Sequence, residues 1–340
     1  MVFIGTFLTM ADGEWEWHNP RHAAQLPLLE QQFDSILHSL IWGNLVLGIP
    51  RMDDVCVMHA MHAVSGDWYE YKLTLEDVLG TVEIGANVSA QLLTSFVTAG
   101  GALVRGTLVN MLAYFNGNGP PCDIPASLSD AEWQFQVQMA NRLRRLTQVA
   151  GRRVFQVMKD GVDQINQLVL SQALADVDTA VSNVFAGSYT DSQLPPPTQE
   201  LLSIVANAYD SWMSFTRDVR RIINSGELSV PESQSEVTIT RLAAENYLVD
   251  SFLADFSQKL VRETLVVRPS IRSVIWQLSE ELQVLAQRMA KEALIVYLGD
   301  TAKNRTGDFE ASAALFEANH AELLLGTDSS SVAPGAPRSC

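Results

Sequence analysis

The chain has few charged residues and very little lysine. Charged residues make up 18% of its 340 residues, against about 25% in a typical soluble domain, and 18 of its 23 basic residues are arginine. A surface with few charges is poorly protected against association, and the planar guanidinium group suits buried ion pairs and phosphate contacts. These features favour a protein that binds macromolecules, although a compositional bias of the coding sequence explains the arginine excess equally well.

Signatures of catalysis are absent from the sequence. It has no His-Glu-x-x-His, no Gly-x-Ser-x-Gly and no glycine motif for dinucleotides or phosphate. We interpret Gly100-Gly101 and Gly117-Asn118-Gly119 as turns. The adjacent carboxylates Asp53-Asp54 and Glu280-Glu281 would diverge by about 100° on a helix, whereas acid–base catalysis needs carboxylates that converge. We therefore expect a protein that is not an enzyme and that has no cofactor.

Cysteines are also few, and histidines form no known metal motif. The three cysteines, Cys56, Cys122 and Cys340, are odd in number and match no disulfide or zinc spacing, which favours a reducing compartment. Five of the six histidines fall in the N-terminal part of the chain: His18, His22, His38, His59 and His62. Zinc needs three or four ligands with defined geometry, so we predict no metal site.

No uninterrupted apolar run reaches the ~18 residues that a membrane-spanning helix needs. The apolar residues 1–10 lack a basic region before them and are interpreted as an arm rather than a secretory signal. We therefore expect no membrane partner, and a location in the cytoplasm or in a virion. Trp15 and Trp17 follow the arm among glutamates, where they either anchor in a partner's pocket or hold the arm on its own lobe.

Charge is distributed unevenly along the chain. Residues 1–140 carry four basic and 15 acidic side chains, whereas residues 141–295 carry 16 basic and 18 acidic ones. Opposite charges on two regions can steer head-to-tail contact between copies. Contact between the two regions within one chain is an equally good interpretation.

Apolar spacing predicts a mainly α-helical protein with at most a small β element. The expected helices cover 26–48, 87–99, 102–115, 129–185, 198–224, 236–267, 270–299 and 308–325. The run 68–75 is the best strand candidate, although a short helix at 74–80 competes with it. The two helices within 87–115 should be buried on several sides. No internal repeat is recognised. We expect an acidic lobe over 1–118, a helical lobe over 127–326 and a disordered tail over 327–340.

Clustered arginines are the main candidates for a binding site. Basic ends of packed helices could line a groove that follows nucleic-acid phosphates, and the proposed phosphate contacts are Arg144, Arg145, Arg152, Arg153, Arg220 and Arg221. The alternative is that Arg220 and Arg221 complement a helix C-terminus and that the other arginines pair with Asp160, Asp163, Glu263, Glu280 and Glu281. The net charge of −16 favours the alternative.

These observations lead to one main functional hypothesis and two alternatives. We expect a self-assembling structural protein of the viral capsid or nucleocapsid type, with copies of itself, and in some assemblies other capsid proteins or RNA, as partners. The first alternative is a nucleoprotein that binds single-stranded RNA in the arginine-lined groove. The second is a helical adaptor that binds partner peptides.

Overall fold

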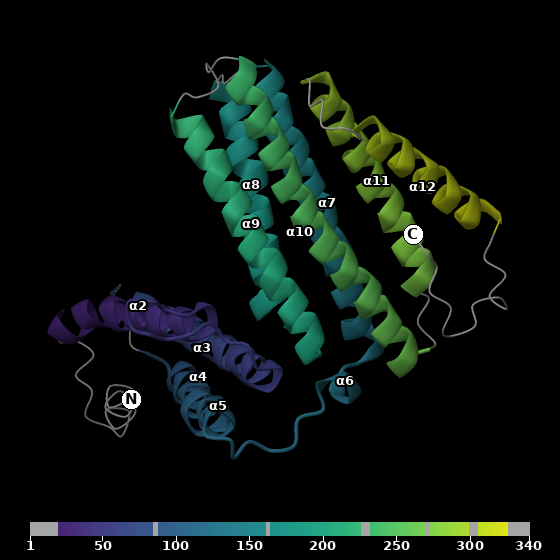
Figure 1. The fold of residues 1–340 in the computed structure, drawn as a ribbon. Helices are drawn as coiled ribbons and strands as arrows, with labels where there is room; N and C mark the ends of the chain where they lie inside the picture. The colour runs from purple at the N-terminus through teal and green to yellow at the C-terminus, as the bar shows by residue number, and fades with distance from the viewer. Residues whose placement is uncertain are drawn as a thin grey trace. The chain divides into compact units, whose positions relative to one another are not determined.

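The computed structural model describes residues 20–83, 88–160, 164–225, 232–269, 273–298 and 305–325. Helices dominate this part of the chain, and no sheet occurs within it (Figure 1). The isolated bridges recorded there are Asn44–Ile49 and Ser188–Gln193. The predicted mainly α class is confirmed. Trp15, Trp17, the arm over 1–10 and the tail over 327–340 lie outside the described residues.

The helices follow one another through short connections. Their bounds are α2 (Pro20–Trp42), α3 (Val55–Glu83), α4 (Ala90–Gly101), the π-helical segment η2 (Ala102–Thr107), α5 (Leu108–Phe115), α6 (Ile124–Ser127), α7 (Asp130–Asp160), α8 (Gln164–Ala186), α9 (Gln199–Ser225), α10 (Glu232–Val267), α11 (Ser273–Tyr297) and α12 (Arg305–Leu325). The expected helices over 198–224, 236–267 and 308–325 correspond to α9, α10 and α12.

The predicted strand at 68–75 is wrong, because these residues lie in the middle of α3. Trp68, Tyr71, Leu75 and Val78 are all buried, and their spacing of three or four residues places them on one face of a helix. Aromatic and β-branched side chains favour strands only when the surrounding packing suits a pleated surface. Here the burial of one helical face overrides that preference.

Contacts divide the chain into two compact units. Unit 1 comprises Met1–Leu128 and Asn183–Leu202, and unit 2 comprises Ser129–Ser182 and Ser203–Cys340. The segment that links α8 to α9 therefore packs in unit 1, although both helices lie mostly in unit 2. The lobe limits expected at 118 and 127 remain predictions.

Unit 2 is built around long helices that bury large aromatic side chains. Trp133, Phe155, Trp212, Phe215 and Phe256 are fully buried, and α7 packs along both α10 and α11 (Figure 1). The predicted capping box begins α7. The Glu132 N–H group donates to Ser129 Oγ at 3.3 Å, and the Ser129 N–H group donates back to Glu132 Oε2 at 2.7 Å.

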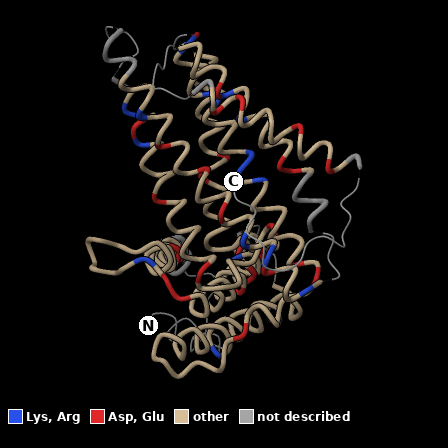
Figure 2. Tube along the Cα trace, turned by 45° about the vertical axis from the view of Figure 1, so that its right-hand side comes forward, with Lys and Arg blue, Asp and Glu red and all other residues tan. Residues whose placement is uncertain are grey.

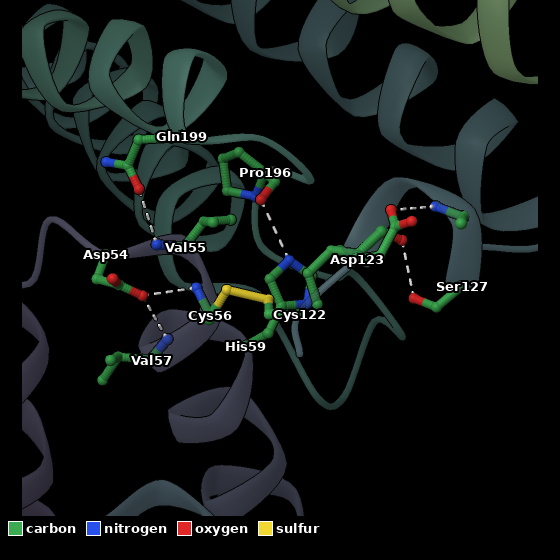
Figure 3. The surroundings of a disulfide bond; sticks show 12 residues. Asp54, Val55, Cys56, Val57, His59, Cys122, Asp123, Ser127, Pro196 and Gln199 are labelled. Atoms are coloured by element: carbon green, nitrogen blue, oxygen red, sulfur yellow. Dashed lines mark hydrogen bonds between the residues drawn. A yellow bond between two sulfur atoms is a disulfide. The ribbon is translucent and has the colours of Figure 1, made fainter. Parts of the chain in front are cut away.

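A disulfide bond in unit 1 joins Cys56 to Cys122, which corrects the expectation that the cysteines form no disulfide (Figure 3). α3 packs along α4, η2 and α5, so the start of α3 lies beside the residues that follow α5. The two Cα atoms are consequently only 6.1 Å apart. Beside the bond, the carboxylate of Asp54 caps α3 by accepting from the N–H groups of Cys56 and Val57, both at 2.9 Å.

The helix pairs α2–α3 and α8–α9 are a structural repeat with an offset of 144 residues. α8 begins and ends 144 positions after α2, and α9 begins 144 positions after α3. In each pair the tryptophan indole N–H group donates to an aspartate Oδ1 at 2.6 Å: Trp68 to Asp34, and Trp212 to Asp178. No repeat with a fixed period is recognised in the sequence, whereas the structure shows this one.

Buried positions extend the correspondence along α3 and α9. The members of each pair below are separated by 144 positions and are both buried. They are Val57 and Leu201, Met58 and Leu202, Met61 and Val205, Val64 and Ala208, Tyr71 and Phe215, Leu75 and Val219, and Val78 and Ile222. The repeat thus preserves the buried face of the helix while changing the residues that form it.

Candidate interaction surface

Arg144, a predicted phosphate contact, is buried in unit 2. Its guanidinium group forms a bidentate ion pair with Glu281 on α11, and its Nε lies 3.9 Å from Asp250 Oδ1 on α10. Only 5% of the Arg144 side chain is exposed, so the charge is neutralised inside the helical packing and does not face solvent. This arrangement holds α7, α10 and α11 together.

A second buried polar group continues this network along α10 and α11. Arg288 Nε donates to Glu292 Oε1 at 2.8 Å, and the Tyr247 hydroxyl donates to the same oxygen at 2.9 Å. Lys291 Nζ donates to Asn246 Oδ1 at 2.7 Å. Burial raises the pKa of Tyr247, so its hydroxyl stays protonated and serves as a donor. The network pairs charges internally, as expected of a structural element.

Four of the other five arginines named from the sequence also contact residues of unit 2. Arg145 lies 3.7 Å from Glu280 Oε2 on α11, whereas Arg220 donates to Asp178 Oδ2 on α8 at 2.9 Å. Arg153 donates to Gln156, and Arg221 pairs with Asp218, both within their own helices. Burial, together with the charge of Arg153, lowers the pKa of Arg152.

These contacts place the arginines in separate groups, with Arg144 and Arg145 facing α11 and Arg220 facing α8. Two of them, Arg144 with Glu281 and Arg145 with Glu280, are ion pairs with residues that the ion-pair alternative named. The RNA-binding groove remains a prediction.

The stretch Ala90–Phe115 is a continuous helix formed by α4, η2 and α5, and it is largely exposed. Only 17% of the most apolar part of this helix is buried. The expectation that the two helices within 87–115 are buried on several sides is therefore wrong. Phe96 is buried and its ring lies 5.0 Å from that of Tyr71 on α3. The same helix also exposes four large apolar side chains along its length: Leu93, Val97, Val109 and Phe115, which are 40%, 42%, 54% and 43% exposed. We call these four residues the apolar face.

This helix also differs from the rest of the chain in charge. Between Glu83 and Asp123 the only charged residue is Arg105 (Figure 2). The expected turn at Gly100-Gly101 is wrong, because the helix continues through it as η2. A helix of this length extends about 39 Å. In a chain with a net charge of −16, it provides a long surface that carries no acidic side chain.

By length and composition alone, Ala90–Phe115 is also the one helix in the described part of the chain that could cross a membrane. The helix that packs along it argues for another interpretation. α3, which packs along this helix, carries Asp67, Glu70, Lys72, Glu76 and Asp77, and charged side chains in a bilayer are costly. The expectation of no membrane partner remains a prediction.

A second apolar surface lies at the end of α2, where the expected helix over 26–48 ends early. Gly43 has φ +79°, and a Cβ there would lie 2.6 Å from Arg51 N. The helix therefore ends at Trp42 and the chain forms a tight loop, Asn44–Ile49, which contains no charged residue. Its tip exposes Leu45, Val46 and Leu47 at 99%, 95% and 67%. We call these three residues the apolar tip.

Two histidines on α3 occupy the region next to the disulfide. His59 Nε2 lies 3.1 Å from the carbonyl oxygen of Pro196 (Figure 3), and burial lowers the pKa of His59. Burial and the nearby charge of His59 lower the pKa of His62 to about 4. Within the described residues, no three His, Cys, Asp or Glu side chains are grouped to hold a metal ion.

Comparisons with known proteins give no further indication of function. No protein-family model, curated protein or solved structure matches the chain. Sequence reasoning missed both apolar surfaces. The run Gly43-Asn-Leu-Val-Leu-Gly-Ile-Pro50 combines turn residues with three consecutive apolar residues, and that signal could have identified the loop.

Proposed function

We propose that this protein is a self-assembling structural protein, a building unit of the capsid or nucleocapsid kind, whose copies associate through the apolar face. The observation that supports the proposal is a 26-residue helix, Ala90–Phe115, that is mostly exposed and has no acidic residue. Large exposed apolar surfaces on soluble proteins mark interaction sites. Two acidic copies can approach each other most easily where neither carries acidic side chains.

The expected strength of this contact follows from the exposed side chains. Leu93, Val97, Val109 and Phe115 are each about half exposed, so completing their burial contributes roughly 1 kcal/mol each. If two copies covered all eight of these side chains, the total contribution would be about 8 kcal/mol. Association costs about 4–15 kcal/mol in lost freedom of motion. The apolar face alone therefore supports only weak pairing, and further contacts would be needed for a stable assembly.

Sedimentation velocity over a wide range of protein concentration tests the proposal. The wild type should form dimers or larger species as its concentration rises, and the double variant Leu93→Asp/Val97→Asp should stay monomeric. Val266→Asp is the matched control, because Val266 is 83% exposed on α10 and outside the apolar face. A wild type that remains monomeric at high concentration, or a control that loses association as completely as the double variant, would contradict the proposal.

A vesicle experiment separates self-assembly from membrane binding. If the wild type floats with uncharged phosphatidylcholine vesicles while remaining monomeric in solution, the apolar face binds lipid and the assembly proposal is wrong. If the protein associates with itself and does not float, the proposal stands.

A further inference from the structure

The structural repeat contains the tight loop twice, and one of the two loops contacts a helix of the same chain. The loop Ser188–Gln193 is the counterpart of Asn44–Ile49, and both follow a glycine with positive φ, Gly187 or Gly43. Both loops also close with the same reciprocal backbone bonds between their first and last residues. The two loops therefore share one backbone conformation but carry different side chains at their tips.

The counterpart loop docks on a helix of unit 1. The ring of Tyr189 lies over Gly66 on α3, so close that a Cβ at Gly66 would be 2.8 Å from Tyr189 Cδ2. The Tyr189 hydroxyl donates to Glu70 Oε1 at 2.6 Å, and its ring lies 5.4 Å from that of Tyr69. The tip of the Ser188–Gln193 loop thus packs against the side of α3.

The Asn44–Ile49 loop presents the same frame with a different tip. Leu45 occupies the position of Tyr189 in the repeat, yet it is 99% exposed. The counterpart tip is mostly polar, with Thr190, Asp191 and Ser192, whereas the apolar tip has no polar side chain. An apolar tip that is mostly exposed is suited to a receptor surface that is itself apolar.

The apolar tip is held in one conformation before it binds. Asn44 Oδ1 accepts from the N–H groups of Val46 and Leu47, both at 3.1 Å, and Asn44 Nδ2 donates to Ser39 Oγ at 3.3 Å. The positive φ of Gly43 and Gly48 completes the turn. A contact surface that is already ordered loses little conformational entropy when it binds.

We infer that the apolar tip of one copy docks on the apolar face of a second copy. This inference rests on the proposed function and names the partner surface. The receptor must be apolar and free of acidic side chains, and Ala90–Phe115 meets both conditions in a chain of net charge −16. Because each copy carries one tip and one face, two copies can exchange both contacts symmetrically. The tips then supply the further contact area that the apolar face needs.

Single variants test whether the tip takes part. Val46→Asp places a charge on a side chain that is 95% exposed, so folding should be unaffected, and an unchanged melting curve by circular dichroism verifies this. We expect its dimer dissociation constant to rise at least tenfold over the wild type, whereas Val266→Asp keeps the wild-type value. A Val46→Asp protein that associates as the wild type does overturns the inference.

Mixing two defective variants identifies the receptor. Val46→Asp has an intact face, and Leu93→Asp/Val97→Asp has an intact tip, so each should be monomeric alone. With one variant fluorescently labelled, the mixture should form mixed dimers through a single tip–face contact, detected by sedimentation. A mixture that stays monomeric although the wild type dimerises overturns the inference.

The outcomes also separate this inference from the proposed function. If the face variant is monomeric but the tip variant dimerises normally, the copies associate face to face, so the proposed function stands and the tip has no part in it. If the wild type itself never associates, both ideas fail. If wild-type monomers float with uncharged vesicles and Val46→Asp does not, the tip binds lipid, which also overturns the inference.

Discussion

Removing the disulfide bond should destabilise the protein by about 4 kcal/mol. The bond joins Cys56 and Cys122, which are separated by 66 positions. For a loop of that length, the chain-entropy model gives an entropy loss of about 15 cal/mol/K in the unfolded chain, or about 4 kcal/mol at 25 °C. The folded state should change little, because the hairpin of α3 with α4, η2 and α5 is also held by Phe96 and the buried face of α3.

Urea unfolding of the wild type and of Cys56→Ser/Cys122→Ser, each with and without reductant, measures this effect. Reductant should lower the wild-type midpoint to that of the variant and leave the variant unchanged. Cys340 is present in both proteins, so its reactions affect both unfolding midpoints equally. Coinciding midpoints without reductant, or three free thiols in folded wild-type protein prepared without reductant, would refute the reasoning.

Two further predictions concern buried charge and acid sensitivity. Glu281→Gln leaves Arg144 without its main partner inside unit 2, so the free energy of unfolding should fall by about 3 kcal/mol. The control Asp160→Asn removes an exposed ion pair and should change the free energy of unfolding by less than about 1 kcal/mol. Urea unfolding at pH 7.5 compares the two variants, and equal losses of stability would contradict the prediction for Glu281→Gln. Burial lowers the pKa of His62 to about 4 from 6.5, so between these pH values the unfolded chain binds a proton that the folded protein does not. Stability should therefore fall as the pH decreases, by about 2 kcal/mol between pH 7.5 and pH 5, and His62→Asn should lose correspondingly less; an identical decline in both proteins would show that His62 is not responsible.

Helices were predictable where the apolar spacing is regular and the ends carry capping residues. Thr198 begins α9, with the Leu201 N–H group donating to its hydroxyl at 3.4 Å, and Ser129 begins α7 through its capping box. These signals are local, because they depend on residues three or four positions apart. They required no knowledge of the tertiary arrangement.

Features that depend on tertiary contacts could not be predicted in the same way. Pairing of Cys56 with Cys122 requires the hairpin that brings their Cα atoms to 6.1 Å. The neutralisation of Arg144 depends on Asp250 and Glu281, which lie on two other helices. Composition also could not indicate how much of Ala90–Phe115 is covered, because an apolar helix has the same sequence pattern whether its neighbours are present or not.

The repeat escaped detection because packing conserves volume and polarity more strictly than identity. Tyr71 corresponds to Phe215 and Met61 to Val205, and both members of each pair are buried. Identical residues remain where a specific geometry is required. Trp68 and Trp212 each need an aspartate partner for the indole N–H group, and Gly43 and Gly187 each adopt a positive φ.

The apolar face is exposed because its helix has few neighbours in unit 1. The helix Ala90–Phe115 packs mainly along α3 and leaves Leu93 and Val97 exposed, whereas α10 of unit 2 packs along both α7 and α11. A helical position that keeps its apolar side chains without a covering neighbour is what association between copies requires, and the apolar tip is a surface of matching chemistry that every copy carries.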